Sequence, residues 1–476
     1  MKNHVVPNEL SQDAINYFLL QACKTNDENS ISYWFKYVKA TSDVRVLTRC
    51  LKELLVNKNY NMILWIIKND TYYLLHTGVV LLMLVRCNFT EAINLLLTRM
   101  QENGIEYQSV INEGLCISTA DKNFEITELL VSYGADYTYK DDTPFINATK
   151  NGYFYMINLF IEKGADCHIR NHRILETATE QRNYPLVGFL MDKGAVCTLN
   201  QSKVLRIACM NVDLPMAKLF IENGADCTCK RNQALRLLSG NDTATDSEKV
   251  TLLNLLFEHQ ASCTDCENEA LRNAARLGHL EFLKVLVQHG ADISTNEHEA
   301  LRSAIRNNHF EMVRFLMENG ADYSCCNHKA LALTVEGNCI EILTYFLTEV
   351  TLSNEALDFL VIHSIQMQNV ELLDLVLRHY HYEKSLDKST ILAAISTNNV
   401  TILTMLFASG AKLTQDTFKT ILQDYHNMSQ DIMRLLLKQD VVITNEIIEI
   451  ALQKRNYSFL DLACSEFQVA FSGNII

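Results

Sequence analysis

Arginine recurs at one position of a regular pattern in the middle of the chain. The set consists of Arg206, Arg236, Arg272 and Arg302, each directly after a leucine, together with Arg276 and Arg306. Because residues four apart lie on one face of a helix, the last two stand one turn beyond Arg272 and Arg302. A guanidinium group carries five N–H donors and a permanent positive charge. The set therefore has two interpretations: bonds to the backbone and to the nearby Glu269 and Glu299, or a basic strip that binds an acidic partner segment.

Cysteine recurs in the same pattern, three residues after a repeated glycine position, at Cys167, Cys197, Cys227 and Cys263. If the repeats stack about 10 Å apart, the Cα atoms of these cysteines exceed the roughly 7 Å limit for a disulfide. We therefore interpret them as small apolar residues. The alternative is a zinc site made by the C-x-C and C-x-x-C pairs Cys227, Cys229, Cys263 and Cys266. Because two of these four belong to the regular pattern, we predict no metal and no cofactor.

The short motifs of several large enzyme classes are absent from the sequence. It contains no G-x-x-x-x-G-K-[ST] loop, no G-x-G-x-x-G fingerprint, no H-E-x-x-H pair and no G-x-S-x-G elbow. Histidines such as His279 and His309 occupy equivalent turn positions, where a polar residue is expected. We therefore predict that the protein is not an enzyme.

Charge and composition limit the partners and the compartment. The formal charge of −14 repels nucleic acid and anionic membrane surfaces. The longest apolar run, Val79 to Val85, has seven residues, whereas about 20 are needed to span a bilayer. The 15 cysteines cannot all pair, and residues 1–10 lack a basic region followed by an apolar core. These features predict a protein of the reducing cytoplasm, with no nucleic-acid or membrane partner.

A period of thirty residues organises most of the chain. Gly-Ala-Asp begins at Gly134, Gly164, Gly224, Gly290 and Gly320, with related tripeptides at Gly194 and Gly410. The intervals are multiples of 30 apart from one of 66, which corresponds to one unit of 30 and one of 36. Nineteen residues before each glycine stands a large apolar residue, and an alanine usually follows three positions later, as in Leu271 with Ala274 and Leu301 with Ala304. This spacing predicts a short helix with one large and one small residue on its buried face.

Each unit also predicts a second helix. Before Gly290 and Gly320 the apolar residues cover most of a helix circumference, and Pro185 and Pro215 stand where a proline at the first helical position loses no hydrogen bond. Residues that tolerate the left-handed conformation separate the two helices, at Gly152, Gly278, Asn308, Asn338 and Asn398. The same register continues through units without a glycine, giving about fifteen repeats, with longer loops near 101–104 and 240–247.

These units resemble ankyrin repeats. Residues 143–166 read TPFINATKNGYFYMINLFIEKGAD, similar to the family pattern TPLHxAxxxGHxxxVxxLLxxGAD. The resemblance implies helix pairs stacked into a solenoid, with β-hairpin fingers between them. Each unit is about three residues short between the glycine and the next helix, and the first box usually reads NEALR, HEALR, NQALR or HKALA. We therefore expect shortened fingers or simple turns. The short units and the EALR box also resemble the ankyrin arrays of giant DNA viruses of amoebae.

The sequence thus predicts an all-α solenoid of about fifteen stacked ankyrin-like helix-turn-helix repeats. We expect a degenerate capping repeat at 1–40, the array at 41–467 and a tail at 468–476. The predicted function is a monomeric, non-catalytic scaffold that binds protein partners on the concave face, in the cytoplasm, or in the host cytoplasm if the chain is viral. The alternative is a substrate adaptor for a ubiquitin ligase, because Pro7 to Leu10 followed by Ile15, Phe18 and Leu19 faintly resembles the start of an F-box.

Overall fold

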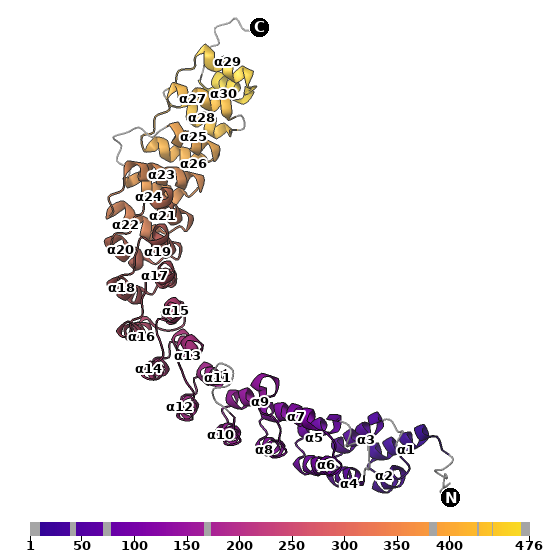
Figure 1. The fold of residues 1–476 in the computed structure, drawn as a ribbon. Coiled ribbons are helices and arrows are strands. Elements are labelled where there is room, and N and C mark those ends of the chain that lie inside the picture. The colour runs from indigo at the N-terminus through magenta and orange to yellow at the C-terminus, as the bar shows by residue number, and fades with distance from the viewer. Residues whose placement is uncertain are drawn as a thin grey trace. The chain divides into compact units, whose positions relative to one another are not determined.

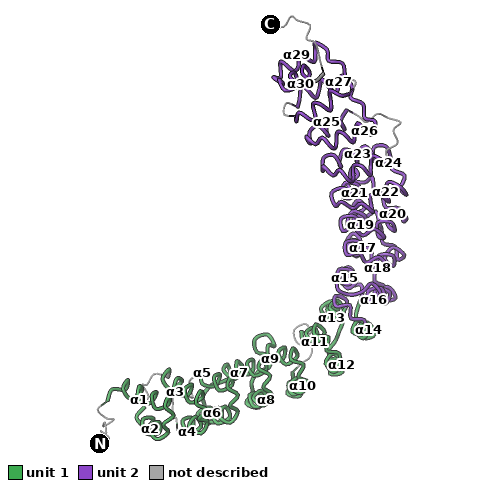
Figure 2. The backbone as a smooth tube through the Cα atoms, turned by 180° about the vertical axis from the view of Figure 1, so that it is seen from behind, with its two compact units in different colours: residues 1–208, 215–226 green, residues 209–214, 227–476 purple. Residues whose placement is uncertain are grey.

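The computed structural model describes residues 10–38, 44–69, 78–165, 173–379, 388–425, 428–439 and 441–467. In these ranges the chain forms thirty helices joined by turns, with no strand (Figure 1). Two compact units comprise residues 1–208 with 215–226, and residues 209–214 with 227–476 (Figure 2). The predicted all-α solenoid of about fifteen helix pairs is confirmed.

The first unit is built from consecutive helix pairs. Within it, odd-numbered helices pack on the next odd-numbered helix, as α5 does on α7 and α7 on α9, and even-numbered helices form a second layer in which α4 contacts α6 and α6 contacts α8. Its helices are α1 (Gln12–Thr25), α2 (Glu28–Phe35), α3 (Val44–Val56), α4 (Tyr60–Asn69), α5 (Gly78–Arg86), α6 (Thr90–Glu102), α7 (Gln108–Ala120), α8 (Phe124–Ser132), α9 (Tyr139–Lys150), α10 (Phe154–Glu162), α11 (Arg173–Glu180), α12 (Tyr184–Asp192), α13 (Leu199–Met210) and α14 (Leu214–Glu222).

The second unit repeats the same two-layer arrangement. Here α17 packs on α19 and α19 on α21, while α16 contacts α18 and α22 contacts α24. Its helices are α15 (Cys229–Ser239), α16 (Asp246–Glu258), α17 (Asp265–Leu277), α18 (Leu280–Gln288), α19 (Thr295–Arg306), α20 (Phe310–Glu318), α21 (Cys325–Glu336), α22 (Ile340–Thr348), α23 (Asn354–Gln366), α24 (Val370–His379), α25 (Lys388–Ser396), α26 (Val400–Ala408), α27 (Gln415–Asp424), α28 (Gln430–Leu437), α29 (Asn445–Gln453) and α30 (Tyr457–Phe467).

The core lies between the two layers of each unit, where the thirty-residue pattern places it. Leu271 and Leu301 are 1% and 0% exposed, and Ala274 and Ala304 are fully buried. Burying one leucine contributes about 1.5–3 kcal/mol, and the alanine lets the neighbouring helix approach closely. Because each pair buries its apolar face only against its neighbours, stability is distributed along the array.

The turn between the two helices of a repeat also follows the prediction. Gly278 and Asn308 have φ values of +83° and +57°, the left-handed conformation that ends a helix. Pro185 lies in the first turn of α12, after the Asn183 cap. Of the two longer loops, that at 240–245 leads from α15 into α16, whose first turn is closed by a capping box of Thr245 and Glu248.

A tight left-handed turn replaces the hairpin finger. Near the start of α17, Cys266, Glu267 and Asn268 have φ values of +52°, +58° and +54°. Five more such triplets stand at 140–142, 200–202, 230–232, 296–298 and 326–328. Left-handed backbone costs roughly 1–2 kcal/mol per L-residue, so each triplet needs compensating contacts. One comes from the third residue: the Asn268 Oδ1 accepts a hydrogen bond of 3.1 Å from the Asp292 N–H.

Candidate functional site

The predicted arginine set lies on the odd-numbered helices, directly after the left-handed triplets. Four of its members make the same contact: a guanidinium nitrogen donates to the main-chain oxygen of the first triplet residue, six positions earlier. These bonds are Arg206 to Asn200 at 3.1 Å, Arg236 to Lys230 at 3.1 Å, Arg272 to Cys266 at 3.3 Å and Arg302 to Asn296 at 2.9 Å. The repeated bond ties four of the six triplets to the helix that follows them.

Carboxylates complete the surroundings of two of these arginines. Arg236 Nη1 lies 2.5 Å from Glu269 Oε2, and Arg302 Nη2 lies 2.7 Å from Glu299 Oε2. The side chains of Arg236 and Arg302 are 19% and 16% exposed, and Arg206 is 8% exposed. The structure therefore contains the bonds of the first interpretation, with backbone oxygens and with both predicted glutamates. A role of these residues in binding a partner stays a prediction.

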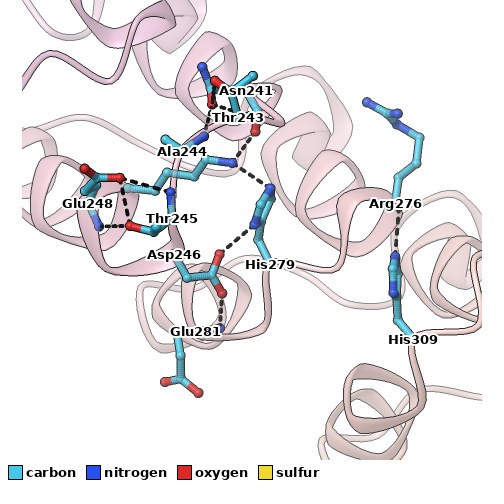
Figure 3. A network of polar contacts seen from close by, with 11 residues as sticks. Asn241, Thr243, Ala244, Thr245, Asp246, Glu248, Arg276, His279, Glu281 and His309 are labelled. Atoms are coloured by element: carbon cyan, nitrogen blue, oxygen red, sulfur yellow. Dashed lines mark hydrogen bonds and ion pairs between the residues drawn. The ribbon is translucent and has the colours of Figure 1, made fainter.

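Arg276 and Arg306 differ from the other four. Both side chains are exposed, and Arg306 is the last residue of α19. The main-chain oxygen of Arg276 accepts a 3.2 Å hydrogen bond from His309 Nε2 of the following repeat, while its side chain extends away from that contact (Figure 3). Positive charge in the last turn of a helix interacts favourably with the helix dipole. These two guanidinium groups are therefore in a position to meet a partner without breaking a turn.

A second polar cluster holds the longer loop before α16. Lys249, fully buried, donates to the main-chain oxygen of Asn241 and, over 2.6 Å, to His279 Nε2. His279 Nδ1 lies 2.6 Å from Asp246 Oδ1, and Figure 3 shows these two side chains directed at each other. Because Nε2 accepts from the lysine, the imidazole proton is on Nδ1 and points to Asp246. The chain Lys249–His279–Asp246 thus joins α16 to the start of α18.

Burial sets the electrostatics of this cluster. It lowers the pKa of Lys249, and the negative charges of Asp246 and Asp242 only partly oppose that effect. A lysine of lowered pKa beside a histidine is also found in nucleophilic sites, but this lysine has 0% exposure. The cluster therefore acts as an internal anchor for the loop. No sequence pattern indicated it, because a lysine is expected on the exposed side of a helix.

The cysteine pattern is explained by burial. Cys197 and Cys263 are 2% and 3% exposed. Their thiols donate to main-chain oxygens near the end of the next even-numbered helix, Cys197 to Asn223 at 3.4 Å and Cys263 to His289 at 3.6 Å. Burial raises the pKa of both thiols. Cys167 lies outside the described residues, and the described cysteines form no disulfide.

The cysteine group Cys227, Cys229, Cys263 and Cys266 is not brought together as a ligand set in the described part of the chain. The group of three or more potential metal-ligating side chains found there is His298, Asp322 and Cys325. No sequence pattern singled out this group, because its members occupy turn positions of the repeat unit. The signal that could have found it is the coincidence of histidine and aspartate at turn positions of one repeat with cysteine at the start of the next.

Two grooves open between neighbouring helices of one layer. One of about 600 Å³ lies between α3 and α5 and is lined by apolar side chains such as Leu55, Val79 and Met83, with Lys52 and Arg86 at its edge. Another of about 690 Å³ lies between α20 and α22, where Arg314, Glu318 and Glu341 make the lining polar. Both are open surface grooves of the kind that separates stacked repeats.

The comparisons with known proteins bear on the second unit. Residues 242–327 match the model of the family described as ankyrin repeats (3 copies). This segment carries ankyrin repeats. Arg272, Arg276, Arg302 and Arg306 belong to the ankyrin segment, whereas Arg206 and Arg236 precede it. No curated protein matches the chain. Ankyrin repeats generally mediate protein–protein interaction, and no enzyme family is indicated.

The described ranges contain no candidate membrane-spanning helix. None of the helices there combines the length and the apolar character that a bilayer crossing requires.

Proposed function

We propose that the chain is a non-catalytic scaffold that binds protein partners on a concave face, and that the odd-numbered helices provide this face. The observation that carries this proposal is the exposure of Arg276 and Arg306 on the neighbouring helices α17 and α19 of the ankyrin segment. Nearer the triplet of α19, Arg302 and Glu299 are instead bonded to each other. The two exposed guanidinium groups are therefore the candidate contacts for a partner.

The chemistry of the two arginines favours an acidic partner segment. They stand at equivalent positions thirty residues apart, so stacking places them in register on adjacent repeats. A guanidinium fork binds a carboxylate through two parallel hydrogen bonds. Because the whole chain carries a charge of −14, this local positive pair would select and orient an acidic segment rather than attract anions in general. Nucleic acid is disfavoured by the same net charge.

The experiment is affinity purification of the full chain from the native cell, followed by mass spectrometry. Arg276→Glu/Arg306→Glu is compared with the wild type and with Arg314→Glu, a matched charge reversal at an exposed arginine of α20 in the other layer. Circular dichroism and the unfolding midpoint check that all three chains are folded. Partners lost from the double variant but kept by Arg314→Glu support the proposal. Identical partner lists for all three chains contradict the role of the arginine pair.

The F-box-like alternative rests on the N-terminal stretch alone. Pro7 to Glu9 lie outside the described residues, while Ile15 and Leu19 are 3% and 0% exposed in α1, which packs on α2 and α3. These contacts favour an ankyrin-like capping pair at this position. The same purification distinguishes the two functions, because a Skp-type subunit among the partners, lost on deletion of residues 1–25, identifies an adaptor.

The proposal also includes the setting in which the scaffold works. We infer a monomer in a reducing cytoplasm, supported by the odd number of cysteines and by the absence of disulfides among the described ones. The thirty-residue units with an EALR box support an origin among giant DNA viruses, in which case the host cytoplasm is the site of action. Size-exclusion chromatography with light scattering tests the oligomeric state.

A further inference from the structure

An imidazole, a carboxylate and a thiol meet at one joint of the second unit. His298, Asp322 and Cys325 each offer one potential metal-ligating atom, and the three atoms lie within 4.8 Å of one another. His298 is the third residue of the left-handed triplet in α19, Asp322 follows α20, and Cys325 is the first residue of α21. The group therefore connects one repeat to the beginning of the next.

Hydrogen bonds already orient the three side chains. The Asp322 N–H donates to His298 Nδ1 over 3.3 Å, and the Cys325 thiol donates to Asp322 Oδ2 over 3.5 Å. The other carboxylate oxygen, Oδ1, accepts from the Ser324 N–H and hydroxyl, each at 2.7 Å. Because Ser324 holds Oδ1, the Oδ2 atom is directed towards the thiol. His298 and Cys325 are partly buried, whereas Asp322 is exposed.

The equivalent connection one repeat earlier is held by hydrogen bonds alone. There the equivalent residues are Asn268, Asp292 and Thr295. Asn268 accepts from the Asp292 N–H over 3.1 Å, as His298 does from Asp322, and its Nδ2 donates to Thr295 Oγ1 over 2.7 Å. The next joint keeps the aspartate but replaces Asn and Thr by His and Cys, the two side chains that bind zinc most readily.

We propose that His298, Asp322 and Cys325 bind a divalent transition-metal ion of the zinc class, with water as the fourth ligand. Nitrogen, oxygen and sulfur ligands at about 2.0–2.3 Å from a tetrahedral ion are about 3.3–3.8 Å apart. The present separations of up to 4.8 Å need only side-chain rotations of about 1 Å to reach that geometry. Three protein ligands and an open position near the surface match the zinc sites that keep a bound water.

Metal binding has a defined proton balance. In the metal-free joint the Cys325 sulfur carries its proton, which it donates to Asp322 Oδ2 over 3.5 Å. When the metal–sulfur bond forms, the S–H bond breaks and that proton passes to solvent. The carboxylate contributes a lone pair, and the imidazole contributes the Nδ1 lone pair, which gives up its hydrogen bond from the exposed Asp322 N–H. Affinity therefore rises with pH. The bound ion would link the triplet of α19 to the start of α21.

The adjacent Cys326 provides a matched control. Its thiol contacts the Glu297 carboxylate, and Arg302 Nη1 lies 3.2 Å from its sulfur. This cysteine is therefore engaged with Glu297 and Arg302 and is not part of the proposed ligand set. Cys326→Ser changes one thiol next to the site, whereas His298→Asn/Cys325→Thr converts the joint into the Asn268–Thr295 form that folds in the preceding repeat.

The experiment is equilibrium dialysis of the full chain against Zn²⁺, followed by elemental analysis. Wild type and Cys326→Ser should retain about one equivalent of zinc per chain, and His298→Asn/Cys325→Thr should lose it. The metal-free unfolding midpoints of the three chains should agree, and only the first two should be raised by added Zn²⁺. Absence of bound zinc in the wild type overturns the proposal. Zinc retained in full by the double variant also overturns it, because other thiols would then hold the ion.

Cobalt substitution gives a second readout. Co²⁺ in the proposed site should show a thiolate-to-metal charge-transfer band, since one cysteine sulfur is a ligand. The band should appear in the wild type and in Cys326→Ser and be missing from His298→Asn/Cys325→Thr. A band of equal intensity in the double variant contradicts the assignment of Cys325.

Discussion

The Arg302 guanidinium donates a 2.9 Å hydrogen bond to the main-chain oxygen of Asn296, the first of three consecutive left-handed residues. Left-handed triplets of L-residues are costly, at roughly 1–2 kcal/mol per residue. A charged donor fixed on the following helix offsets part of that cost, since hydrogen bonds to charged groups contribute about 1.5–3 kcal/mol. Arg302 and its equivalents therefore stabilise four of the six short connections, whereas the triplets at 140–142 and 326–328 form with Ile146 and Ala332 at the arginine position.

This hydrogen bond predicts that two arginines of α19 contribute very differently to the free energy of unfolding. Arg302→Ala should lower the free energy of unfolding of the α19 region by about 1–3 kcal/mol, because the Asn296 oxygen and Glu299 lose their donor. Arg306→Ala, at an exposed position, should change it by no more than about 0.5 kcal/mol. Hydrogen exchange of the α19 amides, with urea unfolding as the global measure, checks both values. Equal effects for the two variants would show that the Asn296 bond does not stabilise the triplet.

The turn before α18 yields a comparison between two glycines. Gly278 and Gly290 have φ values of +83° and +90°, so an alanine at either position is strained. A Cβ at Gly278 would also lie 2.7 Å from His309 Cε1, whereas nothing lies within 4 Å at Gly290. Gly290→Ala should cost about 1 kcal/mol, and Gly278→Ala more than that.

The extra loss should disappear when the ring is removed. Gly278→Ala measured in a His309→Ala background should cost about as much as Gly290→Ala, because only the backbone strain remains. Thermal unfolding of the four chains gives the coupling. Additive effects of Gly278→Ala and His309→Ala would mean that the imidazole moves aside without loss.

The burial of core residues could be predicted from the sequence, whereas the conformation of the turns between repeats could not. The burial of Leu271 and Ala274 could be predicted because the period of thirty residues repeats the same face in every unit. The left-handed conformation of Cys266 and Glu267 could not, since among the triplet residues only asparagine favours that region intrinsically. The shortened unit indicated a turn, but not that three consecutive residues of it would be left-handed, with the Asn268 side chain bonded to the Asp292 N–H that stacking brings beside it.

In the candidate sites, too, contacts within one helix could be predicted from the sequence, whereas contacts between repeats could not. Glu299 could be chosen as the partner of Arg302 because helix spacing is local information. Glu269 contacts Arg236 of the preceding repeat, and that pairing depends on stacking. The joining of His298 to Cys325 depends on how two repeats stack. The cysteine pattern instead pointed to Cys227 and Cys263, which are buried thiols. Spacing along the chain offered a zinc site there only as an alternative to the prediction of no metal, while packing brings three potential metal-ligating side chains together two repeats later.

The buried Lys249 predicts a pH dependence at the alkaline end. Burial lowers its pKa in the folded state below the ordinary value of 10.5. Between those two values the unfolded chain binds the proton more tightly, so the contribution of Lys249 to stability rises with pH through that window. Lys249→Met should remove this rise. It should also lower stability near neutrality by about 1–3 kcal/mol, because the Asn241 oxygen and His279 lose a buried donor.

Thermal unfolding across the neutral to alkaline range measures this effect. Lys284→Met is the matched control, since the side chain of Lys284 is 35% exposed and pairs with Glu281 on the surface. The difference between wild type and Lys249→Met should change with pH, and that for Lys284→Met should stay small. A Lys249→Met protein as stable as the wild type would show that the lysine does not anchor the loop.

The aspartate of the Gly-Ala-Asp motif predicts a dependence at the acidic end. Hydrogen bonds from the Ser294 hydroxyl and N–H, at 2.7 and 2.9 Å, lower the pKa of Asp292 below its ordinary value of 3.8. A carboxyl whose folded pKa is depressed stabilises the protein above its unfolded pKa, and this contribution is lost as pH falls through the folded value. Asp292→Asn should therefore be less stable than the wild type near neutral pH and equal to it in acid. Ser294→Ala should show the same convergence with a smaller difference in stability from the wild type, because the N–H donor remains.

Asp461→Asn, at an exposed position of α30, controls for the loss of one charge. Unfolding midpoints from neutral pH to below the ordinary carboxyl pKa measure all three, and a constant gap between wild type and Asp292→Asn would contradict the role of the ionised carboxylate.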